Sequence, residues 1–578
     1  MKKVLLILFG AFCYVIALAQ WSDNPNENNQ ITPVYSLYDT EMKTNKNGVT
    51  YLVFNRPNGG EGYYQTFLQI IDRTGVKLFP EEGKLISSEP TLTWTAVNEL
   101  LYIDNDGNAL IAVCDLRNSN PGTQDLSYTI YKVSPTGEHL WGENGLDLQQ
   151  GNVTDFQAQI KMIQLEDGSY IFTWIVVDYN TEAEDIFMQR VSKEGGILWD
   201  DELKISGASY PYLVKSGNNQ FILVYAKGSN SYITARKMDF DGENVWANEV
   251  TIYQGGFTIP PLQVILEIVS DQRGGVFVGW YDDRFATRQE SVYVSYVKSD
   301  GTLGFVTAGD IEGLRVGYAP FRGFRPRIAV DSEKDCIFVL WEEGSESQSY
   351  IRYVMQKISY SGELFWDPDG VMVVDNVFPS TLGYHSIQSA GDGRVAVFYM
   401  IAYSTYHSVG NYVALFDSDG EYIWENETVE FALPGHNKEG LLTSSLINDS
   451  YWVTMWEDFR DSENLYNSAL YMQRINIDGT LGDNGTSIKS LKTQNDIIII
   501  PSVVETTTEI IFDNPKTGNV DISLYSITGQ KVTTIHNGQL MQGTNSINWN
   551  KNSSISSGIY LVVVTTTEGT KSSRIIIK

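Results

Sequence analysis

Two segments of this 578-residue chain share a pattern of residue types that could bind an acidic group. The pattern is Trp-x-Asp-x-Arg, and it runs from Trp280 to Arg284 and from Trp456 to Arg460. An arginine presents a planar fork of N–H donors that matches a carboxylate or a sulfate. The same spacing also lets the arginine pair with the aspartate two residues before it and hold the loop. We favour the loop-holding interpretation and keep Arg284 and Arg460 as candidate ligand-binding residues.

A second group of arginines lies close together in an otherwise acidic chain. Arg315, Arg322, Arg325 and Arg327 alternate there with Tyr, Phe and Gly. A basic, aromatic segment of this kind also suits the recognition of a carboxylate or a sulfate. Internal ion pairs are again the favoured alternative, and Arg315, Arg322 and Arg325 remain candidate ligand-binding residues.

The sequence holds no established catalytic or metal-binding pattern. It contains no His-Glu-x-x-His, no Cys/His metal spacing, no Gly-x-Ser-x-Gly and no glycine-rich phosphate loop. With 71 acidic residues, carboxylate pairs will arise by chance, so no glycosidase pair can be selected. We therefore assign no catalytic residue, expect no metal and no cofactor, and prefer binding to catalysis while leaving catalysis open.

The composition favours sheet and restricts the partners. Of the residues, 42% are hydrophobic and only 19% are charged, and the chain contains 50 Gly and 34 Tyr. Such a chain buries a sizeable core and is rich in tight turns. The formal net charge is −30, and a field of that sign repels nucleic acid and anionic membranes. We expect neither as a partner.

The N-terminus resembles a secretory signal peptide. Residues 1–19 contain two lysines, an apolar run and the small-x-small pattern Ala17-Leu18-Ala19. The run is too short for a comfortable membrane span, and polar residues follow at once. We predict a cleaved signal peptide over residues 1–19 and an exported protein that is not an integral membrane protein.

One pattern recurs about every 58 residues along the body of the chain. A strand ends in a turn glycine, and an aromatic residue follows four positions later. The pairs are Gly75–Phe79, Gly137–Trp141, Gly195–Trp199, Gly242–Trp246, Gly301–Phe305, Gly362–Trp366 and Gly420–Trp424, and in the eighth unit Gly479 is followed by Asp483. Each unit contains four short strands joined by hairpin turns. Four-stranded units repeated radially form a β-propeller, so we predict eight blades over residues 20–494.

The Gly-x-x-x-Trp element resembles the tryptophan-docking motif of eight-bladed quinoprotein propellers. The segments YKVSPTGEHLW and KISYSGELFW carry this resemblance best. It implies that each indole packs against the neighbouring blade. A quinoprotein dehydrogenase is a third hypothesis, but it would rest on this motif alone, and the motif is architectural. In propellers, the loops between second and third strands and those that join one blade to the next open on the same face, where ligands usually bind. Here those loops are long and irregular, and we expect the ligand there.

The eighth unit lacks its docking aromatic residue, and the start of the mature chain offers a replacement. Trp21-Ser-Asp-Asn-Pro is similar to the segment that begins at Trp199. We predict that residues 21–31 pair with blade 8 and that Trp21 occupies the vacant site. This arrangement would close the ring and cover an exposed edge strand.

The composition changes after a predicted linker at residues 495–504. Residues 505–578 contain six or seven short alternating strands, which is typical of an immunoglobulin-like sandwich. The segment is similar to the type A C-terminal sorting domain of the type IX (Por) secretion system of certain Gram-negative bacteria. The matching residues are Asn514, Pro515, Gly518, Leu524, Tyr525, Thr528, Gly529, Gln530, Gly543, Ser557, Gly558, Ile559, Tyr560 and the basic terminus that ends at Lys578. The resemblance implies the type IX machinery as a partner, and delivery through the periplasm to the cell surface or the medium.

Two hypotheses of function remain. In the first, the protein is a surface-displayed or released propeller that binds an unknown extracellular glycan or protein. In the alternative, it is a secreted polysaccharide lyase or glycoside hydrolase on the same scaffold. A pocket over the central channel with converging carboxylates would favour the enzyme, whereas a flat loop face would favour binding.

Overall fold

The computed structural model divides the chain into two compact units, Met1–Gly485 and Thr486–Lys578. The predicted signal peptide lies outside the described residues, and the described part contains no helix long and apolar enough to cross a membrane. The described residues are 21–57, 63–92, 100–119, 125–148, 156–178, 180–228, 232–254, 266–284, 290–305, 313–317, 321–345, 350–375, 381–403, 408–462, 466–483, 498–500, 503–504, 506–526, 530–552, 555–566 and 569–578.

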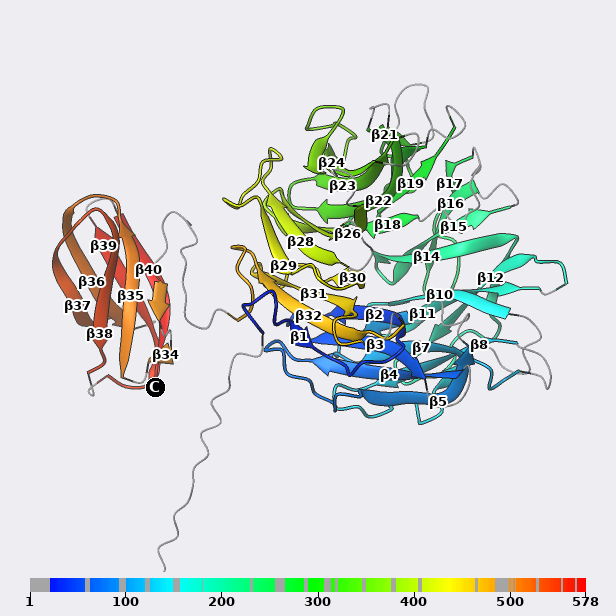
Figure 1. Cartoon of the computed structure of the whole chain (residues 1–578), viewed down its shortest axis with the longest axis horizontal. Helices are drawn as coiled ribbons and strands as arrows, with labels where there is room; N and C mark the ends of the chain where they lie inside the picture. Colours follow the sequence, from blue (N-terminus) through cyan, green and yellow to red (C-terminus); the bar gives the residue numbers. More distant parts are fainter. Residues whose placement is uncertain are drawn as a thin grey trace, which may run out of the picture. The chain divides into compact units, whose positions relative to one another are not determined.

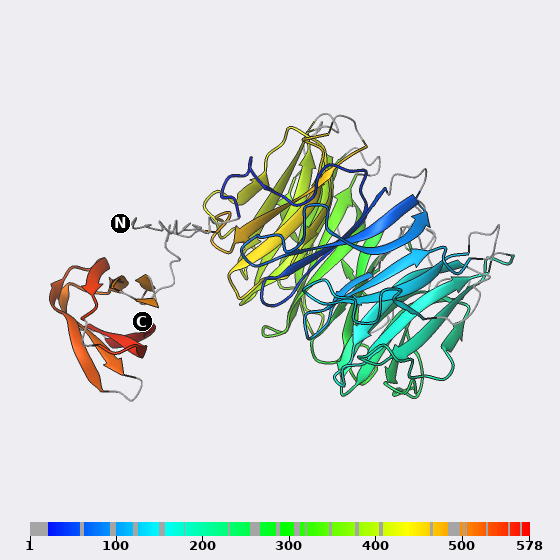
Figure 2. The same cartoon turned by 90° about the horizontal axis from the view of Figure 1, so that it is seen from below.

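The first unit is a ring of eight four-stranded antiparallel sheets (Figures 1 and 2). Blade 1 contains β2 (Tyr38–Thr44), β3 (Thr50–Pro57), β4 (Tyr63–Ile71) and β5 (Lys84–Leu92). Blade 2 contains β6 (Leu100–Ile103), β7 (Ala109–Asp115), β8 (Ser127–Val133) and β9 (Leu146–Asp147). Blade 3 contains β10 (Phe156–Gln164), β11 (Tyr170–Val177), β12 (Glu184–Val191) and β13 (Leu203–Ser206). Blade 4 contains β14 (Ala208–Gly217), β15 (Gln220–Lys227), β16 (Tyr232–Asp239) and β17 (Val250–Tyr253). Blade 5 contains β18 (Glu267–Ser270), β19 (Val276–Asp282), β20 (Ser291–Val297) and β21 (Leu314–Val316). Blade 6 contains β22 (Arg322–Asp331), β23 (Cys336–Gly344), β24 (Ile351–Ser359) and β25 (Val371–Val374). Blade 7 contains β26 (Thr381–Gly391), β27 (Arg394–Ala402), β28 (Val409–Phe416) and β29 (Thr428–Ala432). Blade 8 contains β30 (Lys438–Thr443), β31 (Tyr451–Asp458) and β32 (Ala469–Asn476), together with β1 (Asn29–Gln30) from the N-terminal segment. The predicted eight-bladed propeller is confirmed.

The first strand of each blade is the innermost, and these strands surround the central channel (Figure 1). Neighbouring first strands contact one another around the ring, for example β2 with β6 and β22 with β26. The second strands carry apolar runs because each lies between two other strands and is packed on both faces. Every residue of β7 and of β19 is buried. Cys114 on β7 and Cys336 on β23 are buried free thiols in blades 2 and 6.

The docking aromatics join neighbouring blades. Trp141 Nε1 donates to the carbonyl of Lys193 at 3.1 Å, and Trp246 Nε1 donates to the carbonyl of Ser299 at 3.1 Å. Each acceptor lies two residues before the turn glycine of the next blade. At Gly195, whose φ is +90°, an added Cβ would lie 2.9 Å from the Trp141 ring. Glycine is therefore required both by the turn and by the indole that packs on it.

The N-terminal segment closes the ring. Asn29 and Gln30 of β1 pair antiparallel with Met472 and Tyr471 of β32, so β1 is the fourth strand of blade 8. Trp21 is only 2% exposed, and its Nε1 donates to the carbonyl of Arg73 at 3.0 Å. Arg73 lies two residues before the turn glycine of blade 1, as in the other docking contacts. The predicted pairing of this segment with blade 8 is confirmed.

The second unit is a sandwich of two sheets. One has the order β33-β35-β38 and the other β34-β40-β39-β36-β37, and both contribute to one apolar core. The strands are β33 (Ile498–Ile500), β34 (Val503–Val504), β35 (Thr507–Asn514), β36 (Gly518–Ser526), β37 (Lys531–Leu540), β38 (Gly543–Asn550), β39 (Gly558–Thr566) and β40 (Gly569–Ile577). The expectation of a linker over residues 495–504 therefore needs correction. β33 pairs with β35 and β34 pairs with β40, because the open edges of both sheets accept a further strand.

Candidate functional site

Arg284 is held by the aspartate of its own motif. Its guanidinium makes a two-pronged contact with Asp282, with Nε–Oδ1 at 2.8 Å and Nη2–Oδ2 at 2.5 Å. Trp280 Nε1 donates to the same carboxylate at 2.8 Å, and the guanidinium lies over the Tyr293 ring at 3.8 Å. Asp282 is buried, so this arrangement fixes the loop that follows β19. It is the loop-holding pair that the spacing indicated.

Arg460 repeats this geometry and adds contacts with the N-terminal segment. Its Nη2 lies 2.6 Å from Asp458 Oδ2, to which Trp456 Nε1 also donates. The guanidinium further donates to the carbonyl of Asn26 at 3.2 Å and to Asn28 Oδ1 at 2.9 Å. Arg460 therefore contributes to closing the ring.

Two of the three candidate arginines of blades 5 and 6, Arg322 and Arg325, also pair with glutamates. Arg322 forms a two-pronged pair with Glu290, and Arg315 lies on β21 opposite Tyr293. Arg325 Nη1 donates to Glu342 Oε1 at 3.2 Å, but its side chain is 56% exposed. Arg325 therefore keeps more donor capacity toward solvent than Arg322 does.

Two related carboxylate–arginine pairs were missed at the sequence level. Arg117 contacts Asp115 in blade 2, and the Asp-x-Arg spacing could have revealed it. Arg352 contacts Glu343 in blade 6, which also accepts from Trp341 Nε1. In that pair the arginine comes from the next strand, so local spacing carries no signal.

The residues that resemble the sorting motif shape the sandwich. Asn514 ends β35, and its Nδ2 donates to the carbonyls of Leu540 and Met541 at 3.1 and 3.2 Å. Pro515 follows it on the surface, Gly518 and Gly558 begin β36 and β39, and Gly529 lies outside the described residues. The Tyr560 hydroxyl donates to the carbonyl of Ser556 at 2.8 Å, and the Lys578 N–H donates to that of Val504 at 2.9 Å.

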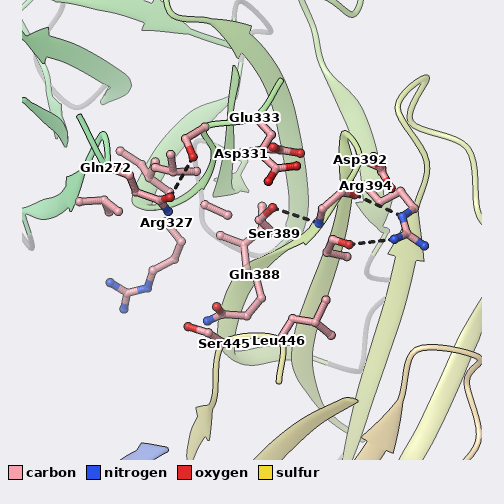
Figure 3. Close-up of a pocket in the computed structure, with 18 of the residues that line it drawn as sticks. Gln272, Arg327, Asp331, Glu333, Gln388, Ser389, Asp392, Arg394, Ser445 and Leu446 are labelled. Atoms are coloured by element: carbon pink, nitrogen blue, oxygen red, sulfur yellow. Dashed lines mark hydrogen bonds between the residues drawn. The ribbon is translucent and has the colours of Figure 1, made fainter. Parts of the chain in front are cut away.

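A polar cavity of about 780 Å³ lies at one end of the central channel (Figure 3). Its walls are the first strands of blades 5–7 and the turns that lead from first to second strands, including the turn after β30. The lining residues are Glu267, Val269, Gln272, Arg327–Glu333, Ser386–Asp392, Arg394, Ser445, Leu446 and Asp449. We expected a ligand at the face of the loops between second and third strands. The cavity instead opens among the short turns, and parts of those long loops lie outside the described residues.

The hydrogen bonds of the cavity leave some polar groups available. Asp331 accepts the N–H of Gly393 at 2.7 Å, and Arg394 donates to the carbonyls of Ala390 and Gly391. Arg327 Nη1 donates to Glu267 Oε2 at 3.1 Å. The amide of Gln388 has no hydrogen bond to any described residue, so it can bind a ligand.

A group of carboxyl side chains lies near the starts of the first strands, whereas the cavity lies near their ends. Asp39 and Glu41 are on β2, and Glu457 is on β31. Burial and the charges of Glu41 and Glu457 raise the pKa of Asp39 to about 7. Burial also raises the pKa of Glu41, which accepts the N–H of Leu101 at 2.6 Å, and that of Glu457, which accepts from Ser468 Oγ at 2.7 Å. Asp39 therefore holds a proton at a pH where most carboxyls are ionised. Sequence spacing gave no signal for this group, because its members come from blades 1 and 8.

Backbone bulges surround the same part of the channel. The first strands of six blades shift register there, at Tyr38/Glu41, Ala158/Lys161, Ser209/Tyr212, Phe324/Arg327, Leu382/His385 and Glu439/Leu442. Asp39, Gln159, Tyr210 and Arg325 occupy bulges with φ between 43° and 56°. Such conformations cost about 1–3 kcal/mol each and persist only where the surroundings impose them. Bulges re-aim the side chains that they carry.

Residues 499–578 match the protein family described as Secretion system C-terminal sorting domain. The C-terminal unit is a sorting domain. It directs export by the type IX secretion system to the cell surface or the extracellular space. This confirms the family resemblance and the localisation inferred from the sequence.

Comparisons for the whole chain are distant. No curated protein matches it. Similar solved structures include a protein of unknown function from Dyadobacter fermentans, at 10% identity over 55% of this chain and 93% of that chain, with a TM-score of 0.33. An exo-β-1,3-galactanase from Phanerochaete chrysosporium matches at 12% identity over 86% and 96%, with a TM-score of 0.28. An α-L-arabinanase from Penicillium chrysogenum matches at 12% identity over 56% and 94%, with a TM-score of 0.30. Likeness at this level does not bear on ligand or activity.

Among the described residues, no group of three or more His, Cys, Asp or Glu side chains is placed to hold a metal ion.

Proposed function

We propose that the propeller binds a glycan in its central channel once the sorting domain has delivered it outside the cell. The observation that carries this proposal is the 780 Å³ cavity, whose size falls within the range of about 300–1,000 Å³ typical of ligand sites. Carboxylates, hydroxyls, amides and backbone groups line it, and these pair with the hydroxyl groups of a saccharide. The unengaged amide of Gln388 supplies donors and an acceptor at one wall.

The proposal gives the candidate arginines a smaller part than their spacing indicated. Arg284, Arg322 and Arg460 are occupied by buried carboxylates, so a ligand would have to displace an internal ion pair to reach them. Arg325 is half exposed but does not line the cavity, so it stays a candidate only for a ligand that extends beyond the cavity.

A glycan array probed with the mature full-length chain tests the proposal, followed by calorimetric titration of the best ligand. Gln388→Ala should weaken binding about 5- to 10-fold, as loss of one well-placed polar contact would. Gln65→Ala is the matched control, because Gln65 is a partly exposed strand glutamine of blade 1 outside the cavity. Absence of glycan binding, or equal effects of the two variants, would contradict the proposal.

A second candidate function is glycoside hydrolysis, and Asp39 is the observation that favours it. A carboxyl that stays protonated near neutral pH can donate a proton to a leaving oxygen, which is the general-acid step of glycoside hydrolysis. If the protein is a hydrolase, Asp39→Asn should abolish release of reducing sugar from the bound glycan without weakening its binding. An unchanged oligosaccharide after long incubation with the wild-type protein would exclude this function for that glycan.

A further inference from the structure

The charge of the channel cavity is unbalanced. Its lining contains five carboxylates, on Glu267, Asp331, Glu333, Asp392 and Asp449, and only two cationic side chains, on Arg327 and Arg394. Both arginines are engaged, Arg327 with Glu267 and Arg394 with two backbone carbonyls. The cavity therefore carries an excess of negative charge within a protein that is itself strongly acidic.

Two of the carboxylates are available to a ligand. Glu333 and Asp449 are exposed, and neither forms a hydrogen bond or an ion pair with any residue in the described part of the chain. Asp331 differs, since backbone N–H groups of Gly393 and Lys334 occupy its oxygens. Among the described residues, Asp392 pairs with Lys334, whose Nζ lies 3.5 Å from Oδ1.

The cavity also lacks the usual means of holding an uncharged sugar. None of its described lining residues is aromatic, so no ring is present on which a pyranose could stack. Affinity must then come from hydrogen bonds and charge. Uronic acids and sulfated sugars would meet like charges, which disfavours them.

We propose that the ligand of this cavity is an oligosaccharide of amino sugars, whose ammonium groups bind the carboxylates of Glu333, in the turn after β22, and of Asp449, in the turn after β30. This inference rests on the proposed glycan-binding function and names the chemical class of its ligand. Hydroxyl groups of the same sugar bind Gln388 and the serines of the lining. An ammonium supplies three donors and a positive charge, which is what each unpaired carboxylate lacks.

Three hexasaccharides with the same β-1,4-linked glucose skeleton test the inference. They carry an amine (chitosan hexamer), an acetamide (chitin hexamer) or a hydroxyl (cellohexaose) at C2. Titrated against the mature full-length chain at pH 6, the chitosan hexamer should bind at least 10-fold more tightly than the other two. Raising the salt concentration from 50 to 500 mM should remove most of this difference.

Three variants separate the cavity from the overall charge of the protein. Glu333→Gln and Asp449→Asn should each weaken chitosan binding about 2- to 5-fold, as expected for an exposed ion pair. Glu363→Gln is the matched control, because Glu363 is an exposed glutamate of blade 6 outside the cavity lining. It should change the affinity little. Equal losses in Glu363→Gln and Glu333→Gln would show binding by overall charge and would overturn the inference.

The other outcomes distinguish this inference from the proposed function. Equal or tighter binding of a neutral hexasaccharide, weakened by Gln388→Ala, would overturn the amino-sugar class and leave glycan binding in the channel intact. Binding of none of the three would also overturn the amino-sugar class, and the glycan array would then decide the proposed function.

Discussion

Removing the indole of Trp21 should open the ring at its seam. This residue begins the described chain, packs with Ile31 and Leu470 in the core between blades 8 and 1, and is 2% exposed. Truncation of a buried aromatic side chain to alanine costs roughly 3–5 kcal/mol. The lost hydrogen bond to the Arg73 carbonyl is part of this cost, since it contributes about 0.5–1.5 kcal/mol.

The thermal effect of Trp21→Ala follows from the size of the propeller. Unfolding entropy is about 2.1 cal/mol/K per residue, so a unit of this length should lose about 3–5 °C in Tm. Trp21→Phe should lose less, about 1–2 kcal/mol, because it keeps most of the ring and gives up the hydrogen bond. Phe79 and Phe305 already occupy the equivalent docking position in blades 1 and 5.

Hydrogen exchange locates the effect. In Trp21→Ala, the amides of Leu470 and Met472 on β32 should exchange faster, because they face the N-terminal segment, which the docked indole helps to hold at that edge. Trp246→Ala is the matched control, since Trp246 is also buried and makes the same contact with the next blade at 3.1 Å. It should cost a similar free energy while β32 keeps its protection.

Two results would refute this reasoning. One is a loss of less than about 1 kcal/mol in Trp21→Ala, which would mean that the indole contributes little to the seam. The other is unchanged exchange on β32, which would mean that closure depends on other contacts, such as those of Arg460 with Asn26 and Asn28.

Three further predictions concern the loop-holding pair, the channel carboxyl and the sorting domain. Arg284→Ala should destabilise the propeller by about 3–5 kcal/mol in denaturant titration, because it leaves the buried Asp282 carboxylate unpaired; a loss below 1 kcal/mol would contradict this. Asp39 has a raised folded pKa of about 7, so its stabilising contribution is complete below its unfolded pKa of about 4 and is lost as the pH rises through 7. Asp39→Asn stays neutral, so relative to the wild type it should gain about 1–3 kcal/mol at pH 8 and nothing near pH 4; the opposite pH trend in urea titrations would argue against the raised pKa. Deletion of residues 486–578 should leave the propeller folded by circular dichroism but retained in the periplasm, and normal appearance outside the cell would contradict the sorting role.

The sequence by itself determined the features that depend on local spacing. A turn glycine followed four residues later by an aromatic side chain reports one blade, because the turn and the docking contact are both local. Counting these units predicted the ring, and the missing aromatic at Asp483 pointed to Trp21 as its replacement. The sorting domain could be recognised equally well from the sequence, since its motif residues follow one another in order to the chain end. The start of the sandwich could not be predicted as well, because β33 and β34 are short strands that only their pairing partners define.

The tertiary structure decided what depends on residues from different blades. The motif of Arg284 allowed either a ligand or Asp282 as a partner, and only the folded loop shows the guanidinium engaged by the buried carboxylate. The channel cavity combines residues from Glu267 to Asp449, which no local period relates. The raised pKa of Asp39 likewise arises from burial and from Glu457, which is brought across the seam only when the ring closes. Local periodicity encodes the blades, whereas the channel and its charges come into existence only when eight first strands meet around one axis.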